Sequence, residues 1–182
     1  LADAIKAAKD GDVIELILGN DGFGNTFTLD IPLIILNKNK ITINLNGHTI
    51  VAGKTGTAIS VLGGNLTLRG PGTIQGNVIV TSSGTLNLEN GVVLGDRSEN
   101  THSYLRVVKG TAIIGGTQKA PLYVELSKNQ TITTADDFKL SPSCGIYLKL
   151  ANDVCKEFND RGSSPDPVEL IKNCTGLTNL YT

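Results

Sequence analysis

Three of the four tyrosines in this chain occupy equivalent places in short segments that alternate apolar and polar residues. Tyr104, Tyr123 and Tyr147 each stand three places before the last apolar residue of such a segment. Rings that recur at one position would stack on an outer face, where each aromatic pair adds about 0.5–1.5 kcal/mol of stability. The same row of rings is also a platform for sugar rings. We favour a stabilising ladder and keep glycan binding by these three tyrosines as the alternative.

The other candidates for acid–base chemistry lack the partners that such chemistry needs. Asp136 and Asp137 are adjacent, but the sequence around them offers neither the His nor the Arg–Lys partners of a polysaccharide hydrolase. A solvated loop pair is the preferred interpretation. His48 follows the Asn46-Gly47 turn and His102 lies in a polar run, so each is predicted to be an exposed turn residue rather than a base.

No metal or cofactor site is predicted. The segment 19–25 is rich in Gly and Asp, as calcium-binding loops are, but it occurs once and those loops bind metal through repetition. Three cysteines, Cys144, Cys155 and Cys174, all lie after residue 140, and no CxxC motif joins them. An odd number cannot be fully paired within the chain, and both a C-terminal disulfide and buried thiols remain open.

A repeat of strand-like segments must position these side chains. Five segments place apolar residues on either side of one polar residue: Ile43-Asn44-Leu45, Leu66-Thr67-Leu68, Leu86-Asn87-Leu88, Leu105-Arg106-Val107 and Val124-Glu125-Leu126. Their last apolar residues are 23, 20, 19 and 19 residues apart. A repeat near 20 residues with a period of two inside it is typical of a β-solenoid. The sequence therefore predicts an all-β fold of stacked coils.

The ends of the repeat are predicted to be capped. Leu1–Lys9 has the pattern of a short amphipathic helix, which would cover the first coil and its unpaired edge. Residues 1–150 are assigned to the solenoid, with 1–10 as the capping helix and Ile146–Leu150 as a sixth rung. Residues 151–182 are assigned to a small C-terminal cap or tail, with a short helix considered for 168–174.

Enzymes of this kind of fold that act on acidic polysaccharides require columns of carboxylates at outward positions of the repeat. The position between the two apolar residues holds Asn44, Thr67, Asn87, Arg106 and Glu125. The next outward position holds Asn46, Arg69, Glu89, Val108 and Ser127. Neither column stacks two carboxylates, so no catalytic residue is assigned and a polysaccharide lyase or hydrolase is the least favoured function.

Composition limits the partners. The formal net charge of −1 over 182 residues argues against broad attraction to nucleic acid or an anionic membrane. No apolar run approaches the roughly 20 residues of a spanning helix, so membrane insertion is not expected. Because the chain opens at Leu1 without a methionine, it is predicted to be part of a longer chain.

With the repeats laid out, the chain resembles the pectate-lyase-like right-handed parallel β-helix superfamily. The opening 1–16 is similar to its capping helix and first strand, while 43–50 and 66–74 are similar to its rungs. The segment 122–133 resembles strands of repeat-rich bacterial cell-surface proteins. This resemblance covers most of residues 1–150 and implies a right-handed coil and an extracellular or cell-surface setting, with both enzymes and adhesins among its members.

The function expected from these observations is a non-catalytic extracellular or cell-surface module that serves as scaffold or adhesin. A glycan or another cell-surface ligand would be its partner. The alternative is a carbohydrate-binding module that uses Tyr104, Tyr123 and Tyr147.

Overall fold

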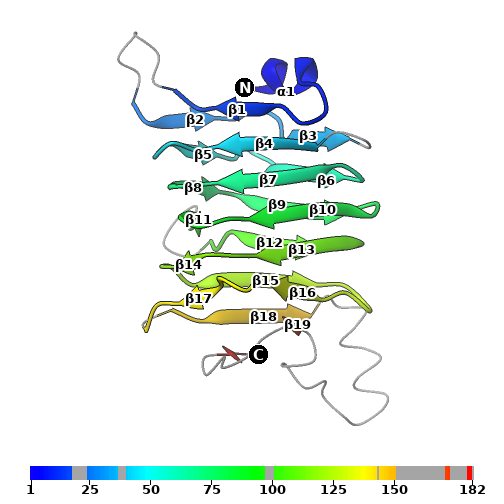
Figure 1. Cartoon of the computed structure of the whole chain (residues 1–182), viewed down its shortest axis with the longest axis vertical. Coiled ribbons are helices and arrows are strands. Elements are labelled where there is room, and N and C mark those ends of the chain that lie inside the picture. The colour runs from blue at the N-terminus through cyan, green and yellow to red at the C-terminus, as the bar shows by residue number, and fades with distance from the viewer. Residues whose placement is uncertain are drawn as a thin grey trace.

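The chain forms a column of stacked β-coils closed at one end by a helix (Figure 1). A computed structural model describes residues 1–17, 24–36, 40–96, 101–142 and 144–150, together with the backbone of 171–172 and 180–181. Every sheet in this part of the chain is built from parallel strand pairs, as a solenoid requires. The predicted all-β solenoid is therefore confirmed.

Three sheets form the walls of the column, and the first and third extend further along it than the second, which covers the first four coils. The first sheet contains, in spatial order, β1 (Val13–Glu15), β4 (Lys40–Asn44), β7 (Asn65–Arg69), β10 (Gly84–Leu88), β13 (Gly110–Ile114), β16 (Ile132–Thr134) and β19 (Ile171–Lys172). The second contains β2 (Thr26–Thr28), β5 (Thr49–Val51), β8 (Gly72–Gln75) and β11 (Val92–Gly95). The third contains β3 (Leu33–Leu36), β6 (Thr57–Leu62), β9 (Asn77–Thr81), β12 (Tyr104–Val107), β15 (Leu122–Leu126), β18 (Ile146–Leu150) and β20 (Leu180–Tyr181).

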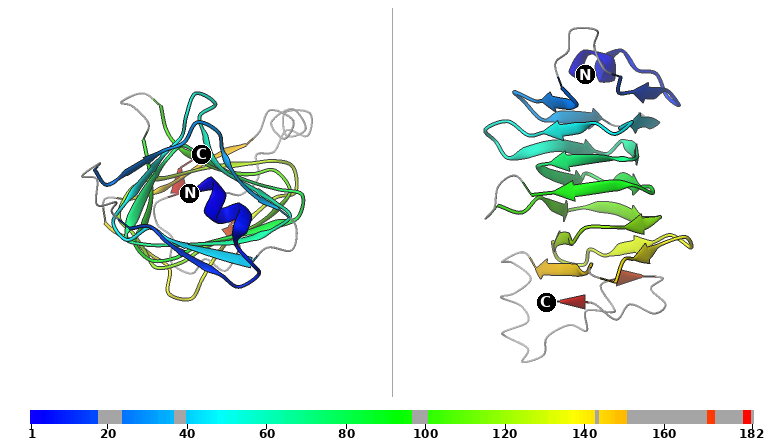
Figure 2. Two further views of the ribbon diagram at one scale, coloured as in Figure 1. Left: turned by 90° about the horizontal axis from the view of Figure 1, so that it is seen from above. Right: turned by 90° about the vertical axis from the view of Figure 1, so that its left-hand side faces the viewer.

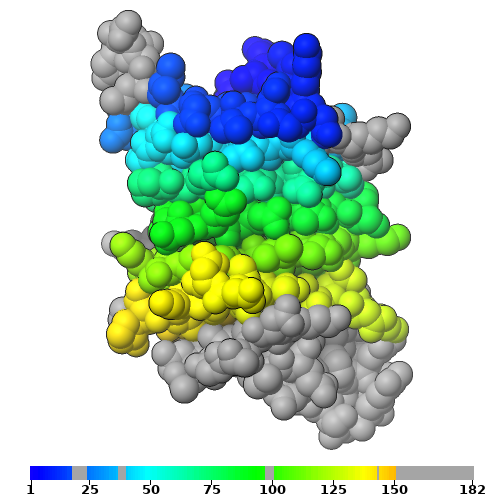
Figure 3. Space-filling view, in the orientation of Figure 1, coloured from blue at the N-terminus to red at the C-terminus, as the bar shows by residue number. Residues whose placement is uncertain are grey.

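Each of the first four coils contributes one strand to each of the three sheets. In the next two coils, β14 (Thr117–Gln118) and β17 (Lys139–Leu140) pair with each other as a short fourth sheet and follow β13 and β16 in the chain. Seen from above, the walls enclose a common interior (Figure 2). In the space-filling view the coils appear as successive bands, from blue near the N-terminus to yellow (Figure 3).

The interior is filled by the inward residues of every strand. In β7 and β10 the leucines Leu66, Leu68 and Leu86 are fully buried, whereas the residues between them are partly exposed. Because side chains alternate between the two faces of a strand, one face of each segment lines the core and the other faces solvent. No coil closes this core alone, so each depends on the coil on either side.

Helix α1 (Ala2–Ala7) lies across the open end of the first coil (Figure 2). Ile5 is its buried residue and belongs to the same apolar core as the strands. Gly11, with φ of +92°, turns the chain from the helix into β1, and its N–H donates to the carbonyl of Lys40. The predicted capping helix is thus confirmed, within shorter limits than Leu1–Lys9.

The predicted alignment of the five repeat segments is wrong in two places. Ile43, not Leu45, pairs with Leu68 on the first sheet. In addition, the segments 105–107 and 124–126 lie on the third sheet. On the first sheet, the residue that pairs with Leu88 in the next coil is Ile114. The strands of both walls carry the same apolar–polar alternation, so the pattern alone does not show to which wall a segment belongs.

At the C-terminal side, the predicted sixth rung is confirmed as β18, which pairs with β15 over Leu122–Leu126 and Ile146–Leu150. The helix considered for 168–174 is wrong at Ile171–Lys172, which form β19 on the first sheet. Leu180–Tyr181 form β20, which pairs with β18 on the third sheet. The remaining residues of the cap expected at 151–182, Cys155 and Cys174 among them, lie outside the described residues. Cys144 is buried.

Replacing an inward leucine should cost far more than replacing its outward neighbour. Leu86→Ala removes a fully buried side chain and is expected to lower the free energy of unfolding by about 2–5 kcal/mol. Thr85→Ala, on the outer side of the same strand, is expected to lower it by less than about 1 kcal/mol. Urea unfolding followed by circular dichroism measures both, and equal losses would contradict the assigned faces.

Candidate functional site

The structure brings Tyr104, Tyr123 and Tyr147 together on the outer face of the third sheet. Tyr104 on β12 is the register partner of Tyr123 on β15, and Tyr123 is the partner of Tyr147 on β18. All three rings are partly exposed, because the residues that follow them, Leu105, Val124 and Leu148, point into the core. The predicted tyrosine column is confirmed in its position. Thr42, Asn65 and Thr85 also stand three places before the last apolar residue of their repeat segments, but they lie on the first sheet.

The rings pack in two different ways. Tyr123 and Tyr147 are stacked, with centroids 4.9 Å apart and planes 22° from parallel. Tyr104 meets Tyr123 by its edge, at 5.9 Å and 61°. Both arrangements are among the favourable geometries of aromatic pairs. The column is therefore held together by contacts between its own rings.

His102 completes the ladder. Its imidazole stacks on Tyr123 at 3.8 Å and 14°, and its Nδ1 lies 3.0 Å from Oδ1 of Asp96. Because His102 and Tyr147 both stack nearly parallel on Tyr123, and two rings do not fit side by side over one face at these distances, they cover opposite faces of the Tyr123 ring. The prediction that His102 is an exposed turn residue did not include this contact. The spacing could have indicated it, because residues two places apart in an extended chain, such as His102 and Tyr104, point to the same side.

A charged row runs beside the tyrosines. Arg106, Glu125 and Lys149 are register partners on β12, β15 and β18. Oε2 of Glu125 lies 3.5 Å from Nη2 of Arg106 and 3.5 Å from Nζ of Lys149. Both cations also approach the Tyr104 ring, at 5.9 Å for Arg106 Cζ and 5.5 Å for Lys149 Nζ. Glu125 thus holds two cations near one aromatic ring, an arrangement that favours cation–π attraction.

The environment of Tyr123 raises the pKa of its hydroxyl above the ordinary value of 10.0. Burial is the main cause, because it disfavours the charged phenolate. The negative charge of Asp96 and the neighbouring Tyr147 and Tyr104 act in the same direction. The ladder therefore favours a neutral Tyr123.

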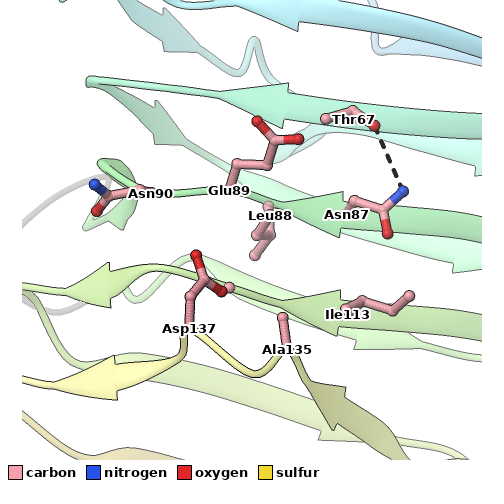
Figure 4. Close-up of a pocket in the computed structure, with 9 residues that line it drawn as sticks. Thr67, Asn87, Leu88, Glu89, Asn90, Ile113, Ala135 and Asp137 are labelled. Carbon is pink, nitrogen blue, oxygen red and sulfur yellow. Dashed lines mark hydrogen bonds between the residues drawn. The ribbon is translucent and has the colours of Figure 1, made fainter.

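A second feature, a hollow of about 400 Å³, lies on the outer face of the first sheet (Figure 4). Its lining consists of Thr67, Asn87, Leu88, Glu89, Asn90, Ile113, Gly115, Ala135 and Asp137. These residues come from four successive coils, which carry β7, β10, β13 and β16. Sequence comparison of single repeats did not indicate this hollow, because it arises only where several coils meet.

The predicted loop pair Asp136-Asp137 is exposed, as expected. The structure adds that Asp137 stands at the edge of the hollow, where its carboxylate rises toward the coil that carries Glu89 (Figure 4). A Cβ added at Gly115 would lie 3.0 Å from Oδ1 of Asp137, so this carboxylate lies directly beside that glycine.

The prediction that His48 is an exposed turn residue is wrong. Its side chain is buried, with 4% of the residue's surface exposed. Asn46 and Gly47 both have positive φ, of 46° and 84°, and they form a corner after which His48 points into the column. Its ring meets the ring of Phe27 edge-on at 5.4 Å. The sequence identified the turn but not the side of the chain that the next residue would take.

Among the described residues, no three His, Cys, Asp or Glu side chains gather closely enough to hold a metal ion. The same part of the chain includes no helix of the length and apolarity needed to cross a membrane. Comparison with known family models, with curated proteins and with solved structures found no match to this chain.

The ladder should contribute measurably to stability. Tyr123→Ala removes two stacked ring pairs and is expected to lower the free energy of unfolding by about 1–3 kcal/mol. Tyr123→Phe keeps the ring and serves as the matched control, with stability close to that of the unchanged chain. Urea unfolding tests the pair of variants. If the alanine and phenylalanine variants are equally stable, the stacking contributes nothing.

Alkaline pH should weaken the folded state through Tyr123. Because its pKa is raised in the folded chain, the stability that this residue contributes is complete below its ordinary value of 10.0 and is lost as the pH rises through the raised value. The unchanged chain is therefore expected to lose more stability above pH 10 than Tyr123→Phe does. Unfolding curves for the two proteins across this range are the measurement, and parallel curves would contradict the assignment.

Proposed function

We propose that this chain is a non-catalytic module of an extracellular or cell-surface protein, in which it acts as a scaffold or adhesin. The observation that supports this function best is that outward side chains on neighbouring coils pair with one another. On the third sheet these are the tyrosine ladder and the charged row of Arg106, Glu125 and Lys149. Such pairs join one coil to the next.

The first sheet has the same kind of contact. Nε of Arg69 lies 2.7 Å from Oε2 of Glu89 on the next coil, and Nδ2 of Asn87 donates to Oδ1 of Asn65 at 3.3 Å. Exposed ion pairs contribute little individually, about 0–1 kcal/mol. Their value here is that they recur from coil to coil on two walls, which suits an elongated element that keeps its shape. That property is what a scaffold or adhesin needs.

The parallel coils and the capping helix also support the proposal that the chain is related to the pectate-lyase-like right-handed β-helix superfamily. Because one fold hosts many activities, this relationship supports the architecture and the extracellular setting more than any one activity.

A carbohydrate-binding module that uses Tyr104, Tyr123 and Tyr147 is the second candidate. The observation in its favour is that partly exposed rings stand beside Arg106 and Lys149, whose N–H groups are suitable donors to sugar hydroxyls. Against it, His102 and Tyr147 cover both faces of Tyr123, and a sugar ring stacks on a free aromatic face. A stabilising role for the ladder is therefore preferred.

The non-catalytic proposal is tested by incubating the chain with acidic and neutral polysaccharides. New reducing ends and the ultraviolet absorbance of unsaturated products are expected to stay at the level of a protein-free control. Release of either product in proportion to protein concentration would overturn the proposal and favour a hydrolase or a lyase.

A glycan array separates the two binding alternatives. If a glycan signal is lost in Tyr123→Ala and kept in Tyr123→Phe, the result supports glycan binding by the tyrosine column. If the ladder only stabilises the fold, any glycan that binds the unchanged chain also binds Tyr123→Ala at temperatures where that variant is folded.

A further inference from the structure

The hollow on the first sheet exists because large outward side chains give way to small ones. Arg69, the last residue of β7, and Glu89, the first residue after β10, stand at equivalent places. At the corresponding places after β13 and β16 stand Gly115 and Ala135. The outer surface of the first sheet is therefore recessed in the coils that follow Glu89. The side chains of Glu89 and Asp137 lie on either side of this recess (Figure 4).

Several polar groups of the hollow already have partners within the protein. Both carboxylate oxygens of Glu89 face Arg69, at 2.7 Å from Nε and 3.5 Å from Nη2. Asn90 accepts a hydrogen bond on Oδ1 from the N–H of Thr117 at 3.1 Å. Asn87 donates from Nδ2 to Asn65 and Thr67. These contacts hold the side chains in place, and a site that is largely formed before its ligand arrives has this property.

Other groups of the hollow are unused. Within the described part of the chain, the carboxylate of Asp137 makes no hydrogen bond or ion pair, and the Oδ1 of Asn87 and the Nδ2 of Asn90 make no hydrogen bond. The hollow thus offers one free carboxylate, one free carbonyl oxygen and one free amide donor. The lining also includes the apolar side chains of Ile113 and Ala135.

We propose that this hollow binds a neutral saccharide unit, an inference that rests on the adhesin form of the proposed function. Sugar hydroxyls both donate and accept, so they match a carboxylate, a carbonyl and an amide set around one space. The C–H face of a sugar would lie against Ile113 and Ala135. A volume of about 400 Å³ lies within the usual range for small-ligand sites, about 300–1,000 Å³.

The charge of the hollow selects a neutral sugar over an acidic one. Arg69 balances Glu89, but no cation balances Asp137 within the described residues. A uronate carboxylate in the same space would meet uncompensated negative charge and be repelled. A sugar hydroxyl would instead donate to Asp137 in a charge-assisted hydrogen bond, which is stronger than one between neutral groups.

The chain offers a matched pair of variants for the test. Asp137→Asn removes the free charge at the hollow, whereas Asp136→Asn makes the same change one residue away, outside the lining. Binding is measured by calorimetry and by backbone amide shifts for a panel of neutral mono- and disaccharides. Glucuronate and galacturonate are the acidic comparison. Circular dichroism confirms that both variants are folded.

A neutral sugar of the panel is expected to bind with saturation and to shift the amides of Gly115 and Ala135. Asp137→Asn is expected to weaken binding about tenfold, as the loss of one hydrogen bond to a charged group implies. Asp136→Asn is expected to leave affinity unchanged, and the uronates are expected to bind more weakly than their neutral counterparts.

The proposal is overturned if no neutral sugar binds, if uronates bind as tightly, or if the two variants lose affinity equally. Calcium alone shifting the same amides in an Asp137-dependent way would also overturn it, in favour of a cation site. These outcomes leave the non-catalytic scaffold standing, because only the release of polysaccharide products contradicts that function.

Discussion

The structure depends on the burial of inward aliphatic side chains between neighbouring coils. Leucine, isoleucine and valine residues of all three walls form one continuous core. Each fully buried side chain of this type contributes about 1.5–3 kcal/mol, provided that the coils above and below keep water out. The parallel ladders place successive coils about 4.8 Å apart, which brings each inward residue into contact with its register partners. Helix α1 provides the same cover at the first coil, where no preceding coil is described.

This constraint leaves the outward positions free to vary, and they differ between walls. On the third sheet they carry rings and charges that contact the next coil: Tyr104, Tyr123 and Tyr147 beside Arg106, Glu125 and Lys149. On the first sheet the outward series changes from Arg69 and Glu89 to Gly115 and Ala135, and the surface becomes hollow. A regular backbone with an irregular outer surface is how a repeat protein can acquire a local site without losing its core.

Much of the fold follows from patterns within single segments. The alternation in 65–69 and 84–88, the amphipathic start at Leu1 and the sixth rung at Ile146–Leu150 all predicted elements that the structure contains. The outward direction of Tyr104, Tyr123 and Tyr147 was also predictable, because each stands next to an inward apolar residue of its own strand. These features depend only on local periodicity, which is a property of the sequence itself.

Features that require knowledge of neighbouring coils were not predictable in this way. The assignment of 105–107 to the third sheet, the inward turn of His48 and the stacking of His102 on Tyr123 all depend on the path of the chain between strands. The meeting of Glu89 with Gly115 and Asp137 depends on which coils are adjacent, across almost fifty residues of sequence. The sequence by itself determined that coils would stack and which residues within a strand would face inward, because burial in a strand follows a period of two. Only the tertiary structure decided which outward side chains meet, because coils of unequal length bring different residues side by side.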